Sequence, residues 1–590
     1  MISIMKGGYR MQVNIPRPEF PRPDFERAEW LNLNGKWDFE YDDSNIGEFN
    51  NWYKSGMFSN QITVPFCYQS ELSGLNDKGL HEYVWYRKEF DLPGSFIGKR
   101  TLLNFGAVDY IAKVWINGEF AGMHRGGHTS FKMDISRFVK NSNNIIVVKA
   151  EDRNECLQPR GKQYWKETLD RCWYTPTTGI WQTVWLEAVG ETYIDRVKLN
   201  PNIDKRNVCA EIFLSSFLSD LQLSVKIMYK NIVIKNIITI VTDRIFKLTL
   251  DFKEYDYIDE IHYWTPETPN LYDIEFKLLK DDQLIDFVMS YFGMRKISVN
   301  DDYILLNNKP YYQKLILDQG YWPESLLTPP NDEAIKFDIE MTKKLGFNGA
   351  RKHQKIEDPR YYYWADKLGL LVWGEMPSGY DFNDEEIENI AKEWIEFIYR
   401  DFNHPCIITW VPLNESWGVR NILIDKNQQN FAKALYYLTK AIDDTRLVST
   451  NDGWEQVKSD VCAIHDYIAN GDDFTKKYLD KEIHTCRDMH DRMIYCEGTK
   501  YEGQPVLITE FGGIAFETDE KGNWGYSGTV RDEVDFQKRY SDITYAIRNM
   551  PYIRGYCYTQ LTDVMQEVNG LMTADRKLKV NLEDIRKINT

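Results

Sequence analysis

The chain has 590 residues, 43% of them hydrophobic, and a formal net charge of −17. A chain of this length divides into several domains, and its hydrophobic content is sufficient for large cores. The acidic surface argues against nucleic acids and anionic membranes as partners, because both would be repelled. The nine cysteines are scattered without a Cys-x-x-Cys pair, which indicates free thiols in a reducing compartment rather than disulfides or a zinc site.

The first ten residues lack the continuous apolar core of a signal peptide. No segment of the chain reaches the ~18 apolar residues that a membrane span needs. We therefore expect a cytoplasmic protein with no membrane partner.

Short strand patterns separated by turn clusters fill residues 12–190. Asn117-Gly118 stands between two apolar-alternating runs and is a hairpin signal. We predict a β-sandwich of the jelly-roll type for this region. The segment from His124 to His128 is interpreted as an exposed loop, with a position at the rim of the functional site as the alternative. Residues 191–297 form a second all-β block, in which Ile, Val and Leu alternate with Lys and Asp, and this pattern predicts an immunoglobulin-like β-sandwich.

From residue 298 to residue 590 strand and helix patterns alternate. The expected helices cover residues 332–345, 359–368, 384–400 and 428–442, and the first of them carries an apolar stripe of Ala334, Phe337, Met341 and Leu345. The expected strands cover residues 311–317, 347–350, 370–373, 407–411, 506–509 and 554–558, with two more near residues 447 and 461. This alternation predicts a (β/α)8 TIM barrel, interrupted by a long insertion at residues 468–503.

Two glutamates end strands of this predicted barrel. Asn414 and Glu415 follow the fourth strand, and Glu510 follows the seventh, where Gly512 and Gly513 free the backbone to turn. Either glutamate alone would be typical of a helix start or a solvated loop. Together, at the barrel end where catalytic side chains lie, they indicate glycoside chemistry. A retaining glycosidase needs one carboxyl group as acid and then base, and a second as nucleophile about 5 Å away.

The motifs around these glutamates resemble the signature of glycoside hydrolase family 2. They are Asn403-His-Pro, Ile-Ile-Thr-Trp, Asn414-Glu415 and Ile508-Thr-Glu510-Phe-Gly, and the resemblance extends over nearly the whole chain. The family includes β-galactosidases, β-glucuronidases and β-mannosidases. The resemblance implies that Glu415 is the acid/base, that Glu510 is the nucleophile, and that Asn414 holds the 2-hydroxyl of the sugar. We expect Glu415 to be neutral and Glu510 charged before the reaction.

Further site residues are also implied by this resemblance. Tyr467 lies where the family keeps a tyrosine that hydrogen-bonds the nucleophile, and Arg351 matches an arginine near the same carboxylate. The residues that could line the site, with a structural role as the alternative for each, are His353, His465, Trp454 and Trp524. No metal or other cofactor is required, and Gly374-Glu-Met-Pro replaces the Glu-x-His magnesium ligands of large β-galactosidases.

Departures from the family pattern bear on the substrate. Leu317-Asp-Gln-Gly320 and Arg351-Lys-His353-Gln differ from the usual motifs, which argues against an ordinary galactose site. The run from Glu567 to Thr573 lacks the Asn-x-Lys pair with which glucuronidases bind the sugar carboxylate.

We predict a retaining exo-β-glycosidase that releases a terminal non-reducing sugar, with a β-galactosidase-like activity as the first choice. The alternatives are a β-galactofuranosidase, a β-glucuronidase, or a non-catalytic carbohydrate-binding protein on the same fold. The partner is a carbohydrate, and a homo-oligomer remains open.

Overall fold

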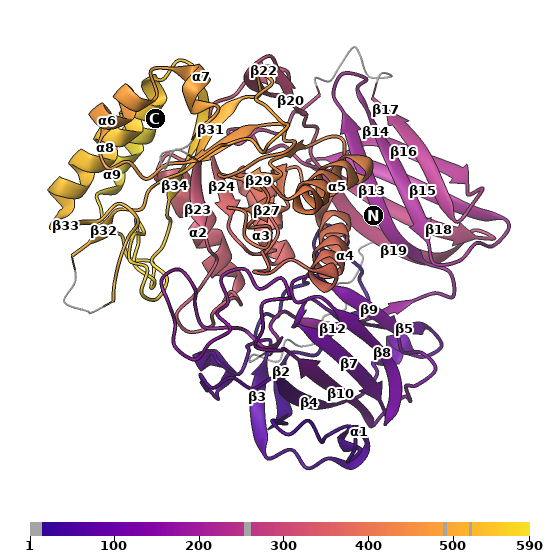
Figure 1. Ribbon diagram of the computed structural model, residues 1–590. Helices are drawn as coiled ribbons and strands as arrows, with labels where there is room; N and C mark the ends of the chain where they lie inside the picture. The colour runs from indigo at the N-terminus through magenta and orange to yellow at the C-terminus, as the bar shows by residue number, and fades with distance from the viewer. Residues whose placement is uncertain (1–14, 253–260, 488–491, 518–521) are drawn as a thin grey trace.

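The computed structural model describes residues 15–252, 261–487, 492–517 and 522–590. Two β-sandwich domains flank a barrel: the first, in indigo, lies below it in Figure 1, and the second, in magenta, lies beside it. The predicted multidomain fold is confirmed. Residues 12–14, where the first domain was predicted to start, and the amino-terminal segment tested for a signal peptide lie outside the described residues.

The first sandwich has two antiparallel sheets. The larger runs in the order β3 (Asn60–Val64), β2 (Gly35–Tyr41), β4 (Tyr83–Phe90), β10 (Asn144–Glu151), β7 (Ile111–Ile116), β8 (Glu119–Arg125). The smaller runs in the order β1 (Trp30–Asn32), β12 (Val184–Val189), β5 (Arg100–Phe105), β9 (Phe131–Asp134). Asn117 and Gly118 have φ values of 53° and 82° and join β7 to β8, so the predicted hairpin is confirmed. Three shorter elements complete the domain: α1 (Trp52–Ser55), β6 (Val108–Asp109) and β11 (Gly179–Ile180).

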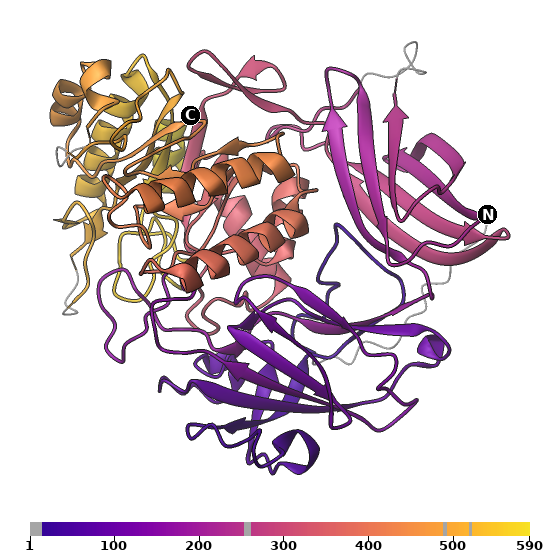
Figure 2. The same ribbon diagram turned by 45° about the vertical axis from the view of Figure 1, so that its right-hand side comes forward.

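Two loops of this sandwich contact the barrel. The segment from His124 to His128 was predicted to be exposed, and this is wrong: the backbone N–H of buried His128 donates to Glu393 at 2.5 Å. The loop from residue 152 to residue 178, between β10 and β11, rises to the barrel in both views (Figures 1 and 2). The N–H groups of Arg160 and Gly161 both donate to the Ser378 carbonyl at 3.0 Å. This second loop therefore carries side chains of the first domain to the barrel.

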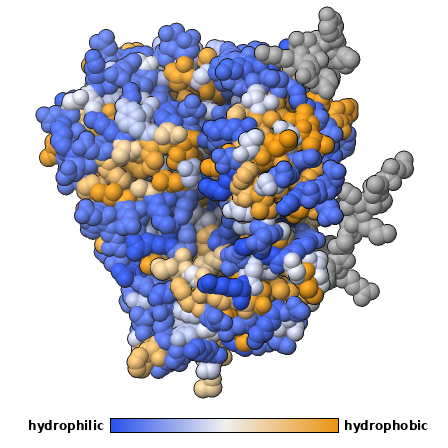
Figure 3. Space-filling view, turned by 90° about the vertical axis from the view of Figure 1, so that its right-hand side faces the viewer, coloured by the Kyte–Doolittle hydropathy of each residue, from blue (hydrophilic) through white to orange (hydrophobic). Residues whose placement is uncertain are grey.

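Along the strands of the immunoglobulin-like sandwich, more buried and less buried residues alternate. Its sheets run in the orders β13 (Ile194–Asn202), β14 (Asn207–Leu214), β17 (Ile245–Asp251) and β16 (Ile232–Ile240), β15 (Leu221–Tyr229), β18 (Tyr272–Lys280), β19 (Gln283–Phe292). Alternate residues of β15 are buried, as half-buried sheets require. The edge strand β16 exposes Ile232, Val233, Ile238 and Ile240, and apolar groups gather on the side of the molecule seen in Figure 3.

The barrel sheet has eight strands with parallel neighbours. Their order is β28 (Leu447–Val448), β26 (Ile407–Val411), β25 (Leu371–Glu375), β24 (Gly349–Lys352), β23 (Gln313–Asp318), β34 (Ile553–Thr559), β31 (Val506–Gly512), β30 (Cys462–His465). Between the end strands, the Asp460 N–H donates to the Val448 carbonyl at 2.9 Å. A three-stranded hairpin sheet, β20 (Ile297–Asn300), β21 (Tyr303–Leu306) and β22 (Lys309–Pro310), precedes the barrel.

Helices cover the outside of the barrel. They are α2 (Asp332–Lys344), α3 (Pro359–Leu368), α4 (Asp384–Asp401), α5 (Lys426–Ile442), α8 (Glu533–Asn549) and α9 (Leu582–Asn589). Asn331 caps α2 by accepting from the Ala334 N–H. The stripe predicted for α2 is correct for Met341 and Leu345, which are buried, but not for Phe337, which is exposed. The buried face of the helix also contains Ile335, Asp338, Ile339 and Thr342. None of the helices in the described ranges has the length and apolar character that a bilayer crossing requires.

Two smaller features complete the comparison with the sequence. The insertion at residues 468–503 contains two short helices, α6 (Gly471–Lys477) and α7 (Lys481–His484), and its residues 488–491 lie outside the described ranges. All nine cysteines are free, as predicted.

Candidate active site

The carboxyl ends of the barrel strands bring charged side chains together. Most of these strands are largely apolar along their buried length and carry charged side chains where they end, so the charged groups meet at one end of the barrel. The buried charged and amide residues at this end include Arg351, Glu375, Asn414, Asp452, His465 and Glu510.

Glu415 directly follows the short strand β27 (Leu413–Asn414), which pairs with β29 (Asn451–Asp452). Glu415 and Ser416 have φ values of 50° and 55°, a left-handed conformation that costs an L-residue roughly 1–3 kcal/mol. The backbone is held there because the Glu415 N–H donates to the Asp452 carbonyl at 3.0 Å and the Ser416 N–H donates to the Asn451 side chain at 2.9 Å. Two successive left-handed residues turn the chain sharply and place the Glu415 carboxylate at the mouth of the barrel.

The Glu510 carboxylate receives two strong hydrogen bonds. Arg351 Nη1 donates to Oε1 at 2.8 Å, and the Tyr467 hydroxyl donates to Oε2 at 2.5 Å. Burial alone would raise the pKa of Glu510, but the charges of His465 and Arg351 hold it below its usual value. Gly512 and Gly513, with φ values of 85° and 61°, turn the chain after Glu510 as the sequence predicted. Glu510 is thus a buried, ionised carboxylate.

His465 lies between the two glutamates. Its Nδ1 is 2.7 Å from Glu415 Oε1 and 3.5 Å from Glu510 Oε2, and its Nε2 is 2.9 Å from Asp452 Oδ1. Burial would lower the pKa of His465, but Glu510, Asp452 and Glu415 raise it to about 9. The ring is therefore an imidazolium at neutral pH.

This charge distribution differs from the neutral Glu415 expected from the sequence. Burial favours the neutral acid, but the hydrogen bond and charge of His465 outweigh it and lower the pKa of Glu415. The other oxygen of the carboxylate, Oε2, accepts from Trp417 Nε1 at 3.2 Å. The proton expected on Glu415 thus resides on His465, one hydrogen bond away.

Arg351 connects the nucleophile candidate to the rest of the site. Its Nε donates to Glu375 at 2.8 Å and its Nη2 donates to Asn414 Oδ1 at 2.5 Å. The amide of Asn414 is thereby fixed with its Nδ2 buried and without a hydrogen-bond partner among the described residues. An unsatisfied buried N–H is costly, and a sugar hydroxyl would satisfy it. Burial raises the pKa of Glu375 to about 7, although Arg351 opposes this shift.

Ligand atoms of Glu415, His465 and Glu510 all lie within 4.8 Å of one another. Such a group could hold a metal ion, but both nitrogens of His465 face carboxylates and its pKa of about 9 leaves it protonated, without a lone pair for a metal. The arrangement is therefore that of two carboxylates bridged by a cation.

The remaining predicted residues lie at different depths. His353 is buried, with Nδ1 2.9 Å from Glu375 in a geometry that makes no hydrogen bond, and burial and the charge of Lys162 lower its pKa well below its ordinary value. Trp454 is half-buried with its ring centroid 6.2 Å from that of Trp417. Trp524 is connected to the site through Tyr526. The ring centroids of Trp524 and Tyr526 are 4.7 Å apart, and Tyr526 stacks on Tyr467 with a centroid distance of 4.4 Å.

The sequence analysis missed several residues of this site. Lys162 arrives on the loop of the first domain, and burial, which would lower its pKa, is outweighed by nearby Cys172, Glu567, Tyr380 and Glu415, so its pKa is raised and it stays charged. Glu567 is buried and accepts from Tyr174 at 2.6 Å and from Gln560 and Asn569 at 3.1 Å each. Asp452 and Trp417 were also missed. Only Glu567 gave a signal, because it stands in the run already compared with glucuronidases.

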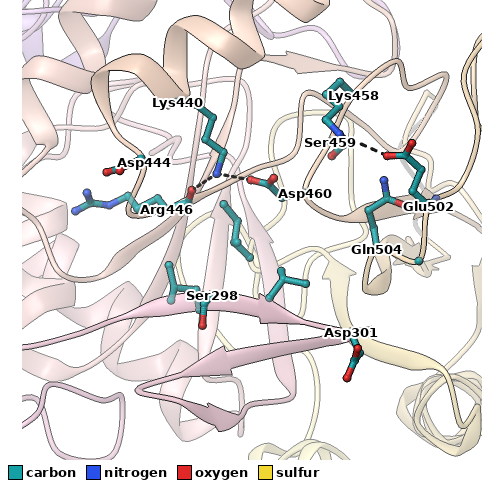
Figure 4. A pocket seen from close by; sticks show the side chains of 14 residues that line it. Ser298, Asp301, Lys440, Asp444, Arg446, Lys458, Ser459, Asp460, Glu502 and Gln504 are labelled. Carbon is teal, nitrogen blue, oxygen red and sulfur yellow. Dashed lines mark hydrogen bonds and ion pairs between the residues drawn. The ribbon is translucent and has the colours of Figure 1, made fainter. Parts of the chain in front are cut away.

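A separate cavity lies at the opposite end of the barrel (Figure 4). It has a volume of about 440 Å³, and its lining residues Leu447, Asp460 and Gln504 stand before or at the start of their strands. Two of its lysines pair with carboxylates of the same lining: Lys440 lies 2.6 Å from Asp460, and Lys458 lies 3.5 Å from Glu502. None of the predicted site residues lines this cavity.

Three sequence profiles match consecutive parts of the chain. The sugar binding domain of glycosyl hydrolases family 2 matches residues 31–186, a second family 2 domain matches residues 192–295, and the family 2 TIM barrel domain matches residues 297–590. The chain belongs to glycosyl hydrolase family 2.

The chain shares only part of its sequence with individual family 2 proteins. A β-galactosidase of Thermoanaerobacter pseudethanolicus is 30% identical over 68% of this chain and 53% of its own length, and a putative β-glucuronidase of Formosa agariphila is 26% identical over 70% and 49%. The chain thus spans about half the length of these relatives. The crystal structure of Ruminococcus gnavus β-glucuronidase shares the fold with a TM-score of 0.78, 17% identity and coverage of 98% of this chain and 100% of that one.

Proposed function

We propose that this family 2 chain is a retaining exo-β-glycosidase. The observation that carries the proposal is the separation of the two carboxylates, whose nearest ligand atoms lie within 4.8 Å of each other. Retaining glycosidases have carboxyl groups about 5–5.5 Å apart, whereas inverting ones leave roughly 6.5–9.5 Å for a water molecule. The positions of half-buried Glu415 and buried Glu510 at the carboxyl ends of barrel strands support the same interpretation.

In the proposed reaction Glu510 attacks the anomeric carbon while a proton passes to the leaving oxygen. Tyr467 and Arg351 orient the attacking carboxylate, and the free N–H of Asn414 meets the 2-hydroxyl of the sugar. Glu415 delivers the proton, which it takes from the His465 imidazolium across their 2.7 Å hydrogen bond. Once the leaving group departs, Glu415 removes a proton from water, and this water cleaves the glycosyl-enzyme with retention.

A neutral sugar, with a β-galactoside as first choice, is favoured by Glu567. This carboxyl group is held by three neutral donors, from Tyr174, Gln560 and Asn569. Glu567 stands where the glucuronidase pattern has its asparagine, and Asn569 stands where that pattern has its lysine. A carboxyl group there accepts hydrogen bonds from sugar hydroxyls, and in its ionised form it repels a uronate.

A β-glucuronidase is the second candidate because of Lys162. This residue is only 6% exposed, and among the described carboxylates none forms an ion pair with its ammonium group. A buried cation of this kind would suit the carboxylate of a uronic acid.

A panel of 4-nitrophenyl β-glycosides tests both candidates. It contains the galactopyranoside, galactofuranoside, glucuronide, mannoside and glucoside, each assayed with the wild type, Glu510→Gln, Glu567→Gln and Lys162→Met. Turnover of the galactoside that falls with Glu510→Gln supports the first choice. Turnover of the glucuronide alone, lost with Lys162→Met, would replace it by the second. Absence of turnover throughout, with retained sugar binding, would leave only a carbohydrate-binding role.

A further inference from the structure

Two groups of aromatic side chains lie beside the catalytic carboxylates proposed above, one attached to each carboxylate. The first is attached to Glu510 through the stacked rings of Tyr467 and Tyr526. The second is attached to Glu415 through Trp417, and we call it the Trp417 strip. Its members are Trp165, Trp173, Tyr380, Trp417 and Trp454.

The two oxygens of Glu415 show on which side of the reaction the strip lies. Oε1 faces His465, whose ring is also 3.5 Å from Glu510, so this oxygen is directed to the side of the nucleophile. Oε2 accepts from Trp417 Nε1 and is directed away from it. In a retaining glycosidase the acid protonates the leaving oxygen, so the groups beyond the acid contact the leaving group. The strip therefore lies on the leaving-group side.

The strip is longer than one sugar ring. Ring centroids follow one another at 4.7 Å from Trp165 to Tyr380, 5.4 Å from Tyr380 to Trp417 and 6.2 Å from Trp417 to Trp454. Its tryptophans are half-buried, whereas Trp394 and Trp410 inside the barrel wall have no exposed surface. Tryptophans that serve only the core are buried completely where the fold allows it, so a row of half-buried rings beside a carboxylate indicates a contact surface.

The strip is built from separate parts of the chain that the fold brings together. Trp165 and Trp173 belong to the loop of the first sandwich, Trp417 and Trp454 follow barrel strands, and Tyr380 donates from its hydroxyl to the Gly161 carbonyl. Arg420 lies over the ring of Trp417 at 4.5 Å, and Arg492 lies over that of Trp454 at 3.9 Å. These cations hold the planes of the two rings.

We propose that the Trp417 strip binds the leaving group, and that the leaving group is a saccharide of at least two rings. The apolar C–H faces of sugar rings pack on aromatic rings, while their hydroxyl edges stay in water, which matches a half-buried aromatic row. This inference rests on the proposed glycosidase function. It adds that the substrate is an oligosaccharide rather than a glycoside with a small aglycone.

Trp454→Ala tests the inference, because Trp454 lies at the outer end of the strip and does not touch Glu415. The probes are the methyl and 4-nitrophenyl β-galactosides and the β-1,4-linked galactobiose and galactotriose, or the same set for the sugar that the panel selects. We expect kcat/KM for the trisaccharide to fall about tenfold, equivalent to ~1.4 kcal/mol. The two small glycosides should stay within about twofold of the wild type.

Trp364→Ala is the matched control. Trp364 is also half-buried and has a cation, Lys336, 5.3 Å from its ring centroid, but it lies on α3 outside the site. It should leave all four probes unchanged. Equal loss for all probes with Trp454→Ala, or loss confined to the 4-nitrophenyl glycoside, would overturn a saccharide-binding strip.

A binding experiment separates failure of this inference from failure of the proposed function. Galactotriose is titrated into Glu510→Gln and into Glu510→Gln/Trp454→Ala, and Kd is read from tryptophan fluorescence. We expect Kd to rise about tenfold in the double variant. If the wild type turns over no glycoside, the glycosidase proposal fails, yet this titration still decides whether the strip holds a saccharide. An unchanged Kd would refute the strip even in an active enzyme.

Discussion

The charge of His465 gives the most specific prediction. Its pKa of about 9 lies above the ~6.5 of a free histidine, a difference equivalent to roughly 3 kcal/mol in favour of the imidazolium in the folded state. Because the folded-state pKa is raised, this stabilisation is complete below about pH 6.5 and is lost as the pH rises through about 9. Loss of the charge also removes the proton that Glu415 delivers.

We therefore expect kcat/KM of the wild type to decline above about pH 9, and His465→Gln to lack this decline. The variant keeps a hydrogen-bond donor without the charge, so its plateau for a methyl glycoside should lie roughly 10²–10⁴ lower. For a 2,4-dinitrophenyl glycoside, whose leaving group departs without being protonated, kcat/KM should fall much less. The assay is the pH profile of kcat/KM for both substrates.

The matched control is His404→Gln. His404 is likewise buried and paired with a carboxylate, Asp366 at 2.6 Å, and its pKa is also raised, because Asp366 outweighs the effect of burial. It lies outside the site, so its variant should keep the alkaline decline. An alkaline decline near pH 9 that persists in His465→Gln would refute the assignment of this proton to His465.

Three further variants test the surroundings of the glutamates. Asn414→Ala, which removes the unpartnered Nδ2, should lower kcat/KM for an aryl glycoside roughly 10²-fold but change little for its 2-deoxy analogue, as paired kinetics would show. Arg351→Met leaves Glu375 buried beside no arginine and leaves Glu510 and Asp452 with His465 alone as their cation, and should cost about 3–5 kcal/mol in urea unfolding, with partial recovery in Arg351→Lys. Gly453→Ala, at φ 86°, would place a Cβ 2.3 Å from the His465 ring and should reduce activity as His465→Gln does. Gly503→Ala, at φ 94° with no atom within 4 Å, should cost only the ~1–2 kcal/mol of a left-handed residue and leave activity intact.

The sequence predicted those features that depend on local patterns. The alternation of strands and helices located the barrel, and the polar residues that end apolar strands identified Glu415 and Glu510. The apolar stripe of α2 was predicted only in part, because the helix exposes Phe337 and buries Asp338, which is paired with Arg576 at 2.9 Å. A hydrophobic pattern cannot show a buried ion pair whose partner is 238 residues away.

Long-range contacts also explain why some features of the site could not be predicted from the sequence. The charge of His465 depends on Asp452 and Glu415, which are 13 and 50 residues away, so nothing in the local sequence predicts an imidazolium. Lys162 and Trp173 belong to a different domain and reach the barrel because the loop of the first sandwich makes hydrogen bonds to it, among them those to Ser378 and Glu567. Residues of such a composite site become visible only when the domains are placed together.

Trapping of the glycosyl-enzyme tests the central claim most directly. The protein is incubated with the activated 2-deoxy-2-fluoro β-glycoside of the sugar selected by the panel, and the intact mass and peptide masses are then measured. The account predicts one added glycosyl group on the peptide that contains Glu510, and none in Glu510→Gln. Turnover of the panel substrate without any covalent adduct, or an adduct on another residue, would contradict it.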